Sequence, residues 1–406
     1  MSTQAGSRSL GPGRTGGVAS VPPPPRHRVI GPRATGKRKV GILAPSYGME
    51  HLSYAMDVPG VQYFQPQPVT LRRLAPQSQF WLYTPFVLGP RTDLLHTFNQ
   101  LPVNRRFVVS FEMELPRNLG TPAAWQDRYS RKVLGSDRCR QILPMSDAAR
   151  NFFMRRIAPQ DRTMMSSKTD VFRGAVSAPD PSWQREERRP GDPIRLLFVG
   201  GEGLRKGLGA TVAAVDRLNA GGIETHLTVI SRVTEETYAV PGVHFPGAEL
   251  SERLQKAAWI TQHASLPNHE VRALMMRHDA LVLPSVDESL GWVVIEAGLS
   301  GLPVIASDMF AIPELVTHGK TGWLLPMELD ADRRWRHLAR PSARDHWDGL
   351  QTGFAAGITR AVEDIAADVD LVPRYGAAAR AKLEAIYLPE QAARHLEAIY
   401  TRALER

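Results

Sequence analysis

Cysteine is nearly absent from this chain of 406 residues, and long apolar runs are absent altogether. The single Cys139 excludes a framework of disulfide bonds and suits a reducing compartment. No window of about 18 apolar residues occurs, so we expect no transmembrane helix. The start of the sequence also lacks the apolar stretch of a secretory signal peptide. These absences predict a cytoplasmic location.

Acidic residues are missing from the start of the chain, where Glu50 is the first. Residues 1–39 carry +8 of the net charge of +9, so the rest of the chain is nearly neutral. Residues 1–38 are also rich in Gly, Pro and Ser, which predicts a disordered basic tail. Most such tails are solvated spacers. At most, we expect this one to make weak contact with the inner face of a membrane, and we expect no specific nucleic-acid partner.

The length of the chain favours two domains, and its strand and helix patterns predict an α/β fold. We expect an N-terminal Rossmann-like domain at 39–176, a hinge at 177–193, a C-terminal Rossmann-like domain at 194–388 and a terminal helix at 389–406. The terminal helix could cross back to the first domain. In the first domain, apolar runs predict strands at 40–44, 80–83, 94–98, 107–111 and 138–146, a helix at 147–157, and a closing strand at 164–172.

Residues 281–326 form the most informative stretch of the chain. They predict a buried strand, a turn, a helix, a second buried strand and a Gly-rich exit. Glu288 lies in the turn, and Glu296 follows eight residues later inside the helix. With Asp287 or Ser289 as its N-cap, the helix would direct backbone N–H groups of residues 289–292 toward a phosphate. Taken alone, an ordinary βαβ unit with solvated glutamates explains this pattern equally well.

A second glycine-rich turn lies upstream, directly after the apolar strand 196–199. It reads GGEGLRKG, from Gly200 to Gly207, and a helix is expected after it. Glycines let the backbone approach a diphosphate, and Arg205 and Lys206 could bind its oxygens. The two turns together predict two phosphate-binding helix starts at one edge of a parallel sheet.

The spacing of Glu288 and Glu296, the flanking DESLGWVVIEAGLSGLPVIAS, the exit GKTGWLLP and the upstream FVGGEGLRKGL resemble retaining glycosyltransferases of family 4. The resemblance covers residues 194–400. It implies the GT-B fold, in which two Rossmann-like, doubly wound domains face each other across a cleft. It also implies a nucleoside diphosphate sugar, UDP- or GDP-linked, as the donor. A glycan or a lipid-linked acceptor would receive the sugar, with retention at the anomeric carbon.

The resemblance also assigns roles to residues. Glu288 would contact the transferred sugar, Glu296 the ribose hydroxyls, and Lys206 with Arg205 the diphosphate. The donor site would further include a set of neighbouring positions, namely Gly200, Gly201, Ser289, Leu290, Gly291 and Glu314. Because the cations and the helix start would stabilise the leaving diphosphate, we expect no cofactor and no catalytic metal.

The sequence departs from the family pattern at Gly201, where an arginine usually stands. Arg205 could supply the missing charge from four residues further on. In the first domain the resemblance fades, and His96, Asn99 and Glu112 are candidates for acceptor contact or proton transfer. A core histidine at a strand end explains His96 slightly better. Of Glu112 and Glu114, we expect only Glu112 to face the cleft, because alternate strand residues point to opposite faces.

Three rival functions remain compatible with these residues. Gly201 and the short first domain would suit a non-catalytic nucleotide-sugar-binding protein. A sugar-nucleotide epimerase shares the GT-B fold, although the paired glutamates favour transfer. A Rossmann dehydrogenase is disfavoured, because FVGGEGLRKG lacks the G-x-G-x-x-G spacing.

Overall fold

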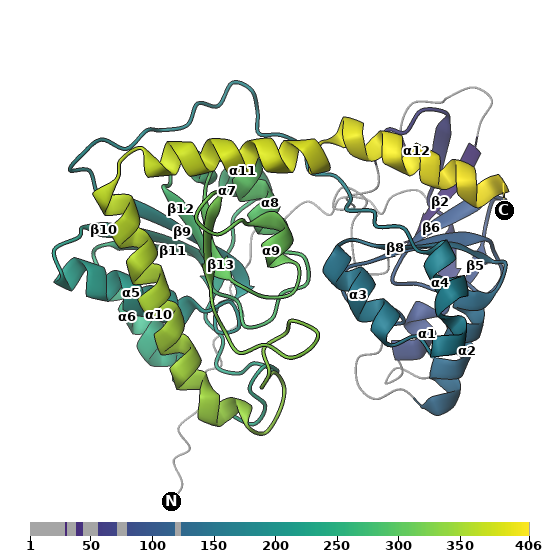
Figure 1. Ribbon diagram of the computed structural model, residues 1–406, viewed down its shortest axis with the longest axis horizontal. Coiled ribbons are helices and arrows are strands. Elements are labelled where there is room, and N and C mark those ends of the chain that lie inside the picture. The colour runs from purple at the N-terminus through teal and green to yellow at the C-terminus, as the bar shows by residue number, and fades with distance from the viewer. Residues whose placement is uncertain (1–28, 31–37, 44–55, 71–78, 118–122, 406) are drawn as a thin grey trace, which may run out of the picture.

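The computed structural model describes residues 29–30, 38–43, 56–70, 79–117 and 123–405. The expected basic tail, apart from residues 29–30 and 38, therefore lies outside the described residues. Two α/β domains lie side by side, and a long pair of helices runs across the top of both (Figure 1).

The N-terminal domain is built on a six-stranded sheet with the strand order β1-β3-β2-β6-β7-β8. All pairs except β1 with β3 are parallel. A separate antiparallel pair, β4 and β5, lies outside this sheet. The strands are β1 (Val29–Ile30), β2 (Arg38–Leu43), β3 (Val61–Phe64), β4 (Gln67–Val69), β5 (Phe86–Leu88), β6 (Leu94–Phe98), β7 (Phe107–Phe111) and β8 (Cys139–Pro144).

Short helices cover the lower face of this sheet in Figure 1. They are α1 (Gln79–Tyr83), α2 (Ala124–Gly135), α3 (Asp147–Arg155), the 3₁₀ turn Pro159–Asp161 and α4 (Arg162–Lys168). The strands expected at 94–98 and 107–111 are confirmed, as is the helix that begins at Asp147. The strands expected at 80–83 and 164–172 are wrong. The first apolar run forms α1, and the second forms α4 followed by a single bridge from Thr169 to Ile142.

The C-terminal domain has a six-stranded, fully parallel sheet in the order β11-β10-β9-β12-β13-β14. In chain order this is 3-2-1-4-5-6, the order of a doubly wound dinucleotide-binding sheet. Its strands are β9 (Ile194–Glu202), β10 (Thr225–Arg232), β11 (Ile260–His263), β12 (Ala280–Leu283), β13 (Val304–Ser307) and β14 (Gly322–Leu325). Its helices are α5 (Leu208–Ala220), α6 (Gly247–Lys256), α7 (Asn268–Met275), α8 (Trp292–Leu299), α9 (Ile312–Leu315), α10 (Ala343–Ala367) and α11 (Leu371–Tyr387).

Both faces of this sheet are buried, which explains its continuous apolar strands. Leu281 and Leu283 pack on the side of α8, whereas Val282 between them packs on the side of α5 and α10. The cluster on the α8 side continues into the N-terminal domain, so the two domains share one apolar core. Phe152 of α3 and Phe310 of the C-terminal domain meet edge to face within it, with ring centroids 5.9 Å apart.

The chain crosses between the domains twice. The first crossing is the stretch 169–193, which contains neither a helix nor a strand. The second is a bend at Leu388, whose extended backbone is the conformation that the following Pro389 favours. There α11 gives way to α12 (Pro389–Glu405), which packs against β6 and β8 of the first domain.

His96 lies beneath α12 and is fully buried. Its Nδ1 atom lies 2.7 Å from the Tyr400 hydroxyl, and its Nε2 atom lies 2.7 Å from the Ser110 hydroxyl. Burial lowers the pKa of His96 from 6.5 to about 3. The imidazole is therefore neutral in the folded protein and joins the terminal helix to the first sheet.

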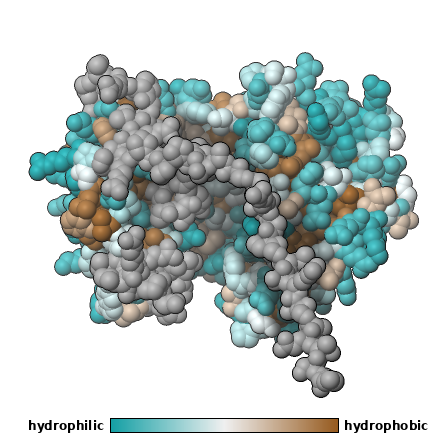
Figure 2. Space-filling view, turned by 180° about the vertical axis from the view of Figure 1, so that it is seen from behind, coloured by the Kyte–Doolittle hydropathy of each residue, from teal (hydrophilic) through white to brown (hydrophobic). Residues whose placement is uncertain are grey.

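None of the described helices is both long enough and apolar enough to cross a bilayer. Where Figure 2 is coloured, the surface is mainly hydrophilic, and its hydrophobic residues form separate groups.

Acid is predicted to destabilise the fold through His96. Below about pH 6.5 the imidazole of the unfolded chain takes up a proton, while that of the folded chain stays neutral down to pH about 3. The free energy of unfolding is therefore fully retained above about pH 6.5. As pH falls below that value, it decreases by up to about 1.4 kcal/mol per pH unit through this residue.

Urea unfolding between about pH 7 and pH 5 tests this prediction. His96→Gln should flatten the pH dependence, whereas His226→Gln, at a half-exposed histidine, should not change it. Equal slopes for the wild type and the His96 variant would contradict the assignment.

Candidate active site

The two predicted turns meet at the centre of the C-terminal sheet. Strands β9 and β12 are neighbours there, and the chain leaves them in opposite directions, toward β10 on one side and β13 on the other. Ligands of such sheets bind outside the carboxyl ends of these two strands. In this chain those ends carry residues 203–207 and 284–291.

Gly207 fixes how closely the two turns approach. It adopts a left-handed conformation with φ of 80° and is the N-cap of α5. A Cβ atom at this position would lie 2.4 Å from the backbone oxygen of Pro284. The turns also share a backbone hydrogen bond of 3.0 Å, from the Val286 N–H to the Arg205 carbonyl oxygen.

An ion pair joins Lys206 to Glu288 across the two turns. The Lys206 ammonium group donates to a Glu288 carboxylate oxygen, and each side chain is only 13% exposed. The aliphatic part of Lys206 packs over Gly200, where a Cβ atom would approach it to 2.7 Å. The structure therefore brings together two residues that lie 82 positions apart and that the sequence analysis had assigned to one site.

Arg205 is tied into the same loops. Its Nη1 atom donates to the Asp287 carbonyl oxygen at 2.6 Å, and its Nε atom donates to Glu202 at 2.9 Å. Gly201 is exposed, and a Cβ atom there would meet nothing within 4 Å. A side chain could therefore start at this position without a clash at its first carbon.

The sequence analysis missed a network around the Asp287 side chain. Its carboxylate accepts a hydrogen bond from the Tyr238 hydroxyl at 2.5 Å and one from the Arg334 guanidinium group at 3.2 Å. Burial and the Asp287 charge raise the pKa of Tyr238. Nothing local in the sequence links Arg334 to Asp287, which lies 47 positions away.

Helix α8 begins later than expected. Its N-cap is Gly291 with φ of 82°, whereas Asp287 and Ser289 precede the helix and are engaged elsewhere. Leu290 is buried beneath the turn. Glu296 lies on α8 and accepts a hydrogen bond from the Asn268 amide at 3.0 Å. Burial raises the pKa of Glu296, which marks it as a largely desolvated carboxylate.

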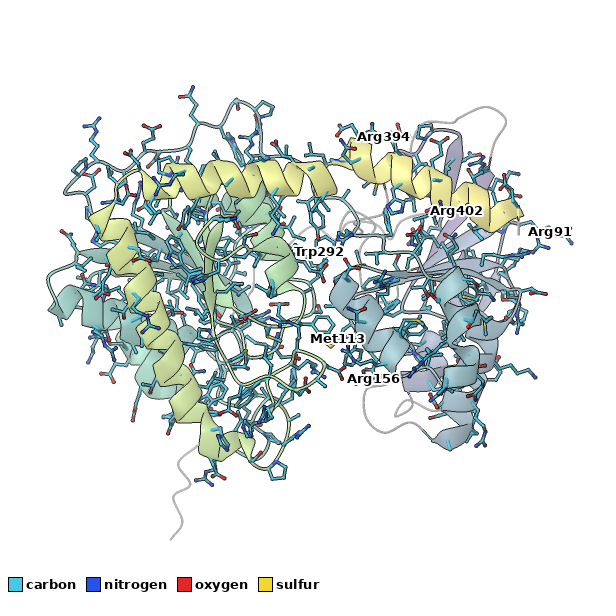
Figure 3. The ribbon with its side chains drawn as sticks, viewed as in Figure 1. Arg91, Met113, Arg156, Trp292, Arg394 and Arg402 are labelled. Atoms are coloured by element: carbon cyan, nitrogen blue, oxygen red, sulfur yellow. The ribbon has the colours of Figure 1, made fainter. Side chains whose placement is uncertain are left out.

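Glu112 reaches across from the N-terminal domain. Its carboxylate accepts hydrogen bonds from the Ser289 hydroxyl at 2.9 Å and from the Trp292 indole N–H at 2.7 Å. Figure 3 shows Trp292 and Met113 where the two domains face each other. Strand β7 ends at Phe111, so the alternation of faces does not extend to Glu114. Burial raises the pKa of Glu114, and the charges of Arg156, Arg334 and Arg117 act against that rise. Glu112 does contact the other domain, but the strand argument that excluded Glu114 does not apply.

Three predicted residues are buried or bonded elsewhere in the structure. His96 is buried in the first core, so the structure does not bring it to the turns around Lys206 and Glu288. Asn99, the neighbouring candidate, is also buried. Glu314 accepts hydrogen bonds from the first two N–H groups of α3, at Asp147 (3.1 Å) and Ala148 (2.8 Å), and it contacts Arg173 at 3.4 Å. It satisfies a helix start of the other domain.

Two aspartates with the spacing Asp-x-Asp occur at 330–332, near the same edge. The Asp332 carboxylate pairs with Arg155 at 2.6 Å and Arg156 at 2.9 Å, both from the N-terminal domain. The Asp330 carboxylate accepts the backbone N–H groups of Asp332 and Arg334 at 2.9 and 3.0 Å. Both carboxylates therefore have protein partners, which join the domains and shape the turn.

Comparisons with known proteins agree with this geometry. Residues 193–334 match the family model described as "Glycosyl transferases group 1". This part of the chain therefore resembles a group 1 glycosyl transferase domain. The match contains both turns, Glu288, Glu296 and Arg334, and it ends before α10.

A relative by sequence is WcaL of Salmonella typhimurium, whose name assigns it to colanic acid biosynthesis as a glycosyltransferase. It is 32% identical over 190 residues, which cover 45% of this chain and 43% of the relative. The chain spans less than half of the length of the curated relatives it matches.

Two solved structures share the arrangement of both domains. Sucrose-phosphate synthase from Thermosynechococcus elongatus has a TM-score of 0.59 at 14% identity, over 91% of this chain and 100% of that one. HepE from Anabaena, in complex with UDP and glucose, has a TM-score of 0.52 at 14% identity, over 84% and 86% of the two chains. At this identity the likeness concerns the fold, which is GT-B.

Alanine at Gly207 is predicted to lower stability by more than the strain of a left-handed backbone conformation alone. Gly207→Ala and Gly222→Ala both place alanine in the left-handed region, at a cost of about 1–2 kcal/mol. Only at Gly207 does the new Cβ atom meet a backbone oxygen, whereas Gly222 has open space. Chemical denaturation should therefore show a clearly larger loss of stability for Gly207→Ala. Equal losses would mean that the turns can separate without cost.

Proposed function

We propose that this chain is a retaining GT-B glycosyltransferase of the family 4 type. It transfers a sugar from a UDP- or GDP-sugar to a glycan or lipid-linked acceptor. The observation that carries the proposal is the Lys206–Glu288 pair at the centre of the sheet, with the desolvated Glu296 eight residues further on. HepE was solved in complex with UDP and glucose, and its fold is similar to that of this chain, which supports a UDP-sugar as the donor.

The proposed roles follow from the chemistry of each group. As the glycosidic bond breaks, negative charge builds on the leaving diphosphate, and Lys206 and Arg205 stabilise it together with the start of α8. We expect this charge stabilisation to need no metal ion. Glu288 orients hydroxyl groups of the transferred sugar, and Glu296 accepts hydrogen bonds from the ribose hydroxyls.

The N-terminal domain supplies the acceptor side of the proposed site. Glu112 already bonds to Ser289 and Trp292, so a carboxylate of one domain lies at the helix start that faces the donor in the other. The acceptor would enter between the domains, and their contact would exclude water that could hydrolyse the donor.

The two glutamates are predicted to affect nucleotide binding differently. Glu296→Ala removes a charged acceptor for the ribose and should weaken UDP or GDP binding roughly 10- to 100-fold, equivalent to about 1.5–3 kcal/mol. Glu288→Ala should leave that affinity unchanged or raise it, because Lys206 loses its carboxylate partner and becomes available to phosphate. The rate of sugar transfer should fall in both variants.

Calorimetric titration with UDP, GDP, ADP and NAD measures these affinities and identifies the base. Glu363→Ala, at an exposed glutamate of α10, is the matched control and should bind like the wild type. Equal weakening by Glu288→Ala and Glu296→Ala would contradict the proposed roles, and tight binding of NAD would favour a dehydrogenase.

Gly201 favours one second candidate, a protein that binds a nucleotide sugar without transferring it. The missing arginine removes a cation from the diphosphate, and a Cβ atom at Gly201 would meet nothing within 4 Å. Gly201→Arg is predicted to raise kcat/KM for transfer roughly tenfold or more, because charge-assisted hydrogen bonds to the leaving group contribute about 1.5–3 kcal/mol.

Gly201→Gln is the control for side-chain size without charge. If the wild type transfers sugar and only the arginine variant does so with a higher kcat/KM, the chain is an enzyme whose rate is limited by the missing cation. Nucleotide binding without turnover in all three proteins, assayed with a panel of acceptors, would favour the non-catalytic candidate. Release of an altered nucleotide sugar without an acceptor would instead indicate an epimerase.

A further inference from the structure

A cluster of Glu328, His337 and His346 lies outside the proposed active site. Among the described residues, these three each offer one ligand atom, and the three atoms lie within 4.8 Å of one another. Glu328 and His337 belong to the segment between β14 and α10, and His346 lies in the first turn of α10. In Figure 1, α10 rises from the lower edge of the C-terminal domain.

We propose that Glu328, His337 and His346 form a binding site for one Zn²⁺ ion. Two imidazoles and one carboxylate are a ligand set that zinc accepts, with water as a fourth ligand, whereas Mg²⁺ and Ca²⁺ prefer sites built of oxygen alone. The inference depends only on these side chains and not on the proposed transfer of sugar.

The spacing of the first two ligands fits a tetrahedral ion. Zinc binds histidine nitrogen and carboxylate oxygen at about 2.0–2.2 Å, and in a tetrahedron this places neighbouring ligand atoms about 3.3–3.6 Å apart. The Nε2 atom of His337 lies 3.4 Å from a carboxylate oxygen of Glu328. The pair therefore already has the separation of two zinc ligands.

His337 is held in place on its other side. Its Nδ1 atom lies 3.1 Å from the Ser342 hydroxyl, the kind of outer contact that fixes the orientation of a metal-binding imidazole. The ring of Trp335 packs against it with centroids 5.8 Å apart, and Trp335 is itself buried. Only 13% of the His337 side chain is exposed. A packed aromatic base thus supports a preoriented ligand.

His346 completes the set after its exposed ring rotates out of the stack. Its ring stacks on His337 with centroids 3.6 Å apart and an angle of 13° between the planes. Because His346 is exposed, its ring can tilt until its lone pair points at the same ion as the Nε2 atom of His337. Metal binding would thereby replace the stacking of the two imidazole rings with two metal–nitrogen bonds.

Bound zinc would brace the turn between Glu328 and His337. That turn is closed by backbone hydrogen bonds of 2.8 Å from Arg336 to Glu328 and from Asp330 to Arg334. It carries Asp332, which pairs with the other domain, and Arg334, which bonds to Asp287 beside Glu288. The ion would therefore stiffen a segment that joins the two domains and supports the β12–α8 loop.

Titration of the tag-free, full-length protein with ZnCl₂ tests the site. We expect one equivalent to bind, Mg²⁺ not to compete, and Co²⁺ in place of zinc to show the visible absorption of a tetrahedral ion. His346→Ala should weaken zinc binding at least tenfold without unfolding the chain, because that side chain is exposed. His337→Ala should do the same, although the loss of packing on Trp335 also lowers stability.

His244→Ala is the matched control, since His244 is an exposed histidine beside two carboxylates, Glu235 and Glu236, at 3.5 and 3.8 Å. Its zinc affinity should equal that of the wild type. Zinc should also slow hydrogen exchange in residues 329–336. The proposal is overturned if the wild type binds no zinc at micromolar concentrations, or if His346→Ala binds it as tightly as the wild type.

Discussion

The contact between the turn after β9 and the turn after β12 determines the rest of the site. It places an ammonium group and a carboxylate in a largely buried pair, and each of these charges would be costly to leave unpaired. The pair can form because Gly207 has no side chain and lets the backbone rest on Pro284. Lys206 and Glu288 therefore have defined positions before any ligand arrives, which is the preorganisation that charge stabilisation requires.

Side chains from outside the two turns support the same contact. Tyr238 and Arg334 hold the Asp287 side chain while Arg205 holds its carbonyl oxygen. The domains are joined further by the carboxylates of Glu112, Glu314 and Asp332. The arginines that pair with Asp332 are nearly half exposed, and such pairs contribute only about 0–1 kcal/mol each. The continuous apolar core and the crossing helix therefore contribute most to holding the domains together, and the ion pairs set their alignment.

Much of this arrangement follows from local sequence. Strands buried on both faces give continuous apolar runs, and glycines mark the turns where the backbone must come close, so the C-terminal sheet and the Lys206–Glu288 site were predictable. The failures in the first domain have a physical cause. Residues 80–83 and 164–172 are short apolar segments whose length does not distinguish a buried strand from a helical turn.

The partners of individual side chains were harder to predict than the elements. Arg334 bonds to Asp287, which lies 47 positions away, and Glu314 bonds to the start of α3, which lies 167 positions away. Such pairs depend on how the two domains are placed, and no local pattern encodes that placement. The start of α8 shows the same limit at short range. Asp287 and Ser289 are good capping residues, but longer-range partners bind both, and Gly291 becomes the cap.

The return of the last helix has a consequence for how the chain matures on the ribosome. Tyr400 packs on His96 from 304 positions further along the chain, so α12 can cover the first sheet only after residue 400 has been synthesised. At roughly 5–20 residues per second, that interval is about 15–60 s. During this time the strands of the first domain expose apolar surface that α12 later covers. The N-terminal domain is therefore completed only after the chain of the C-terminal domain has been synthesised.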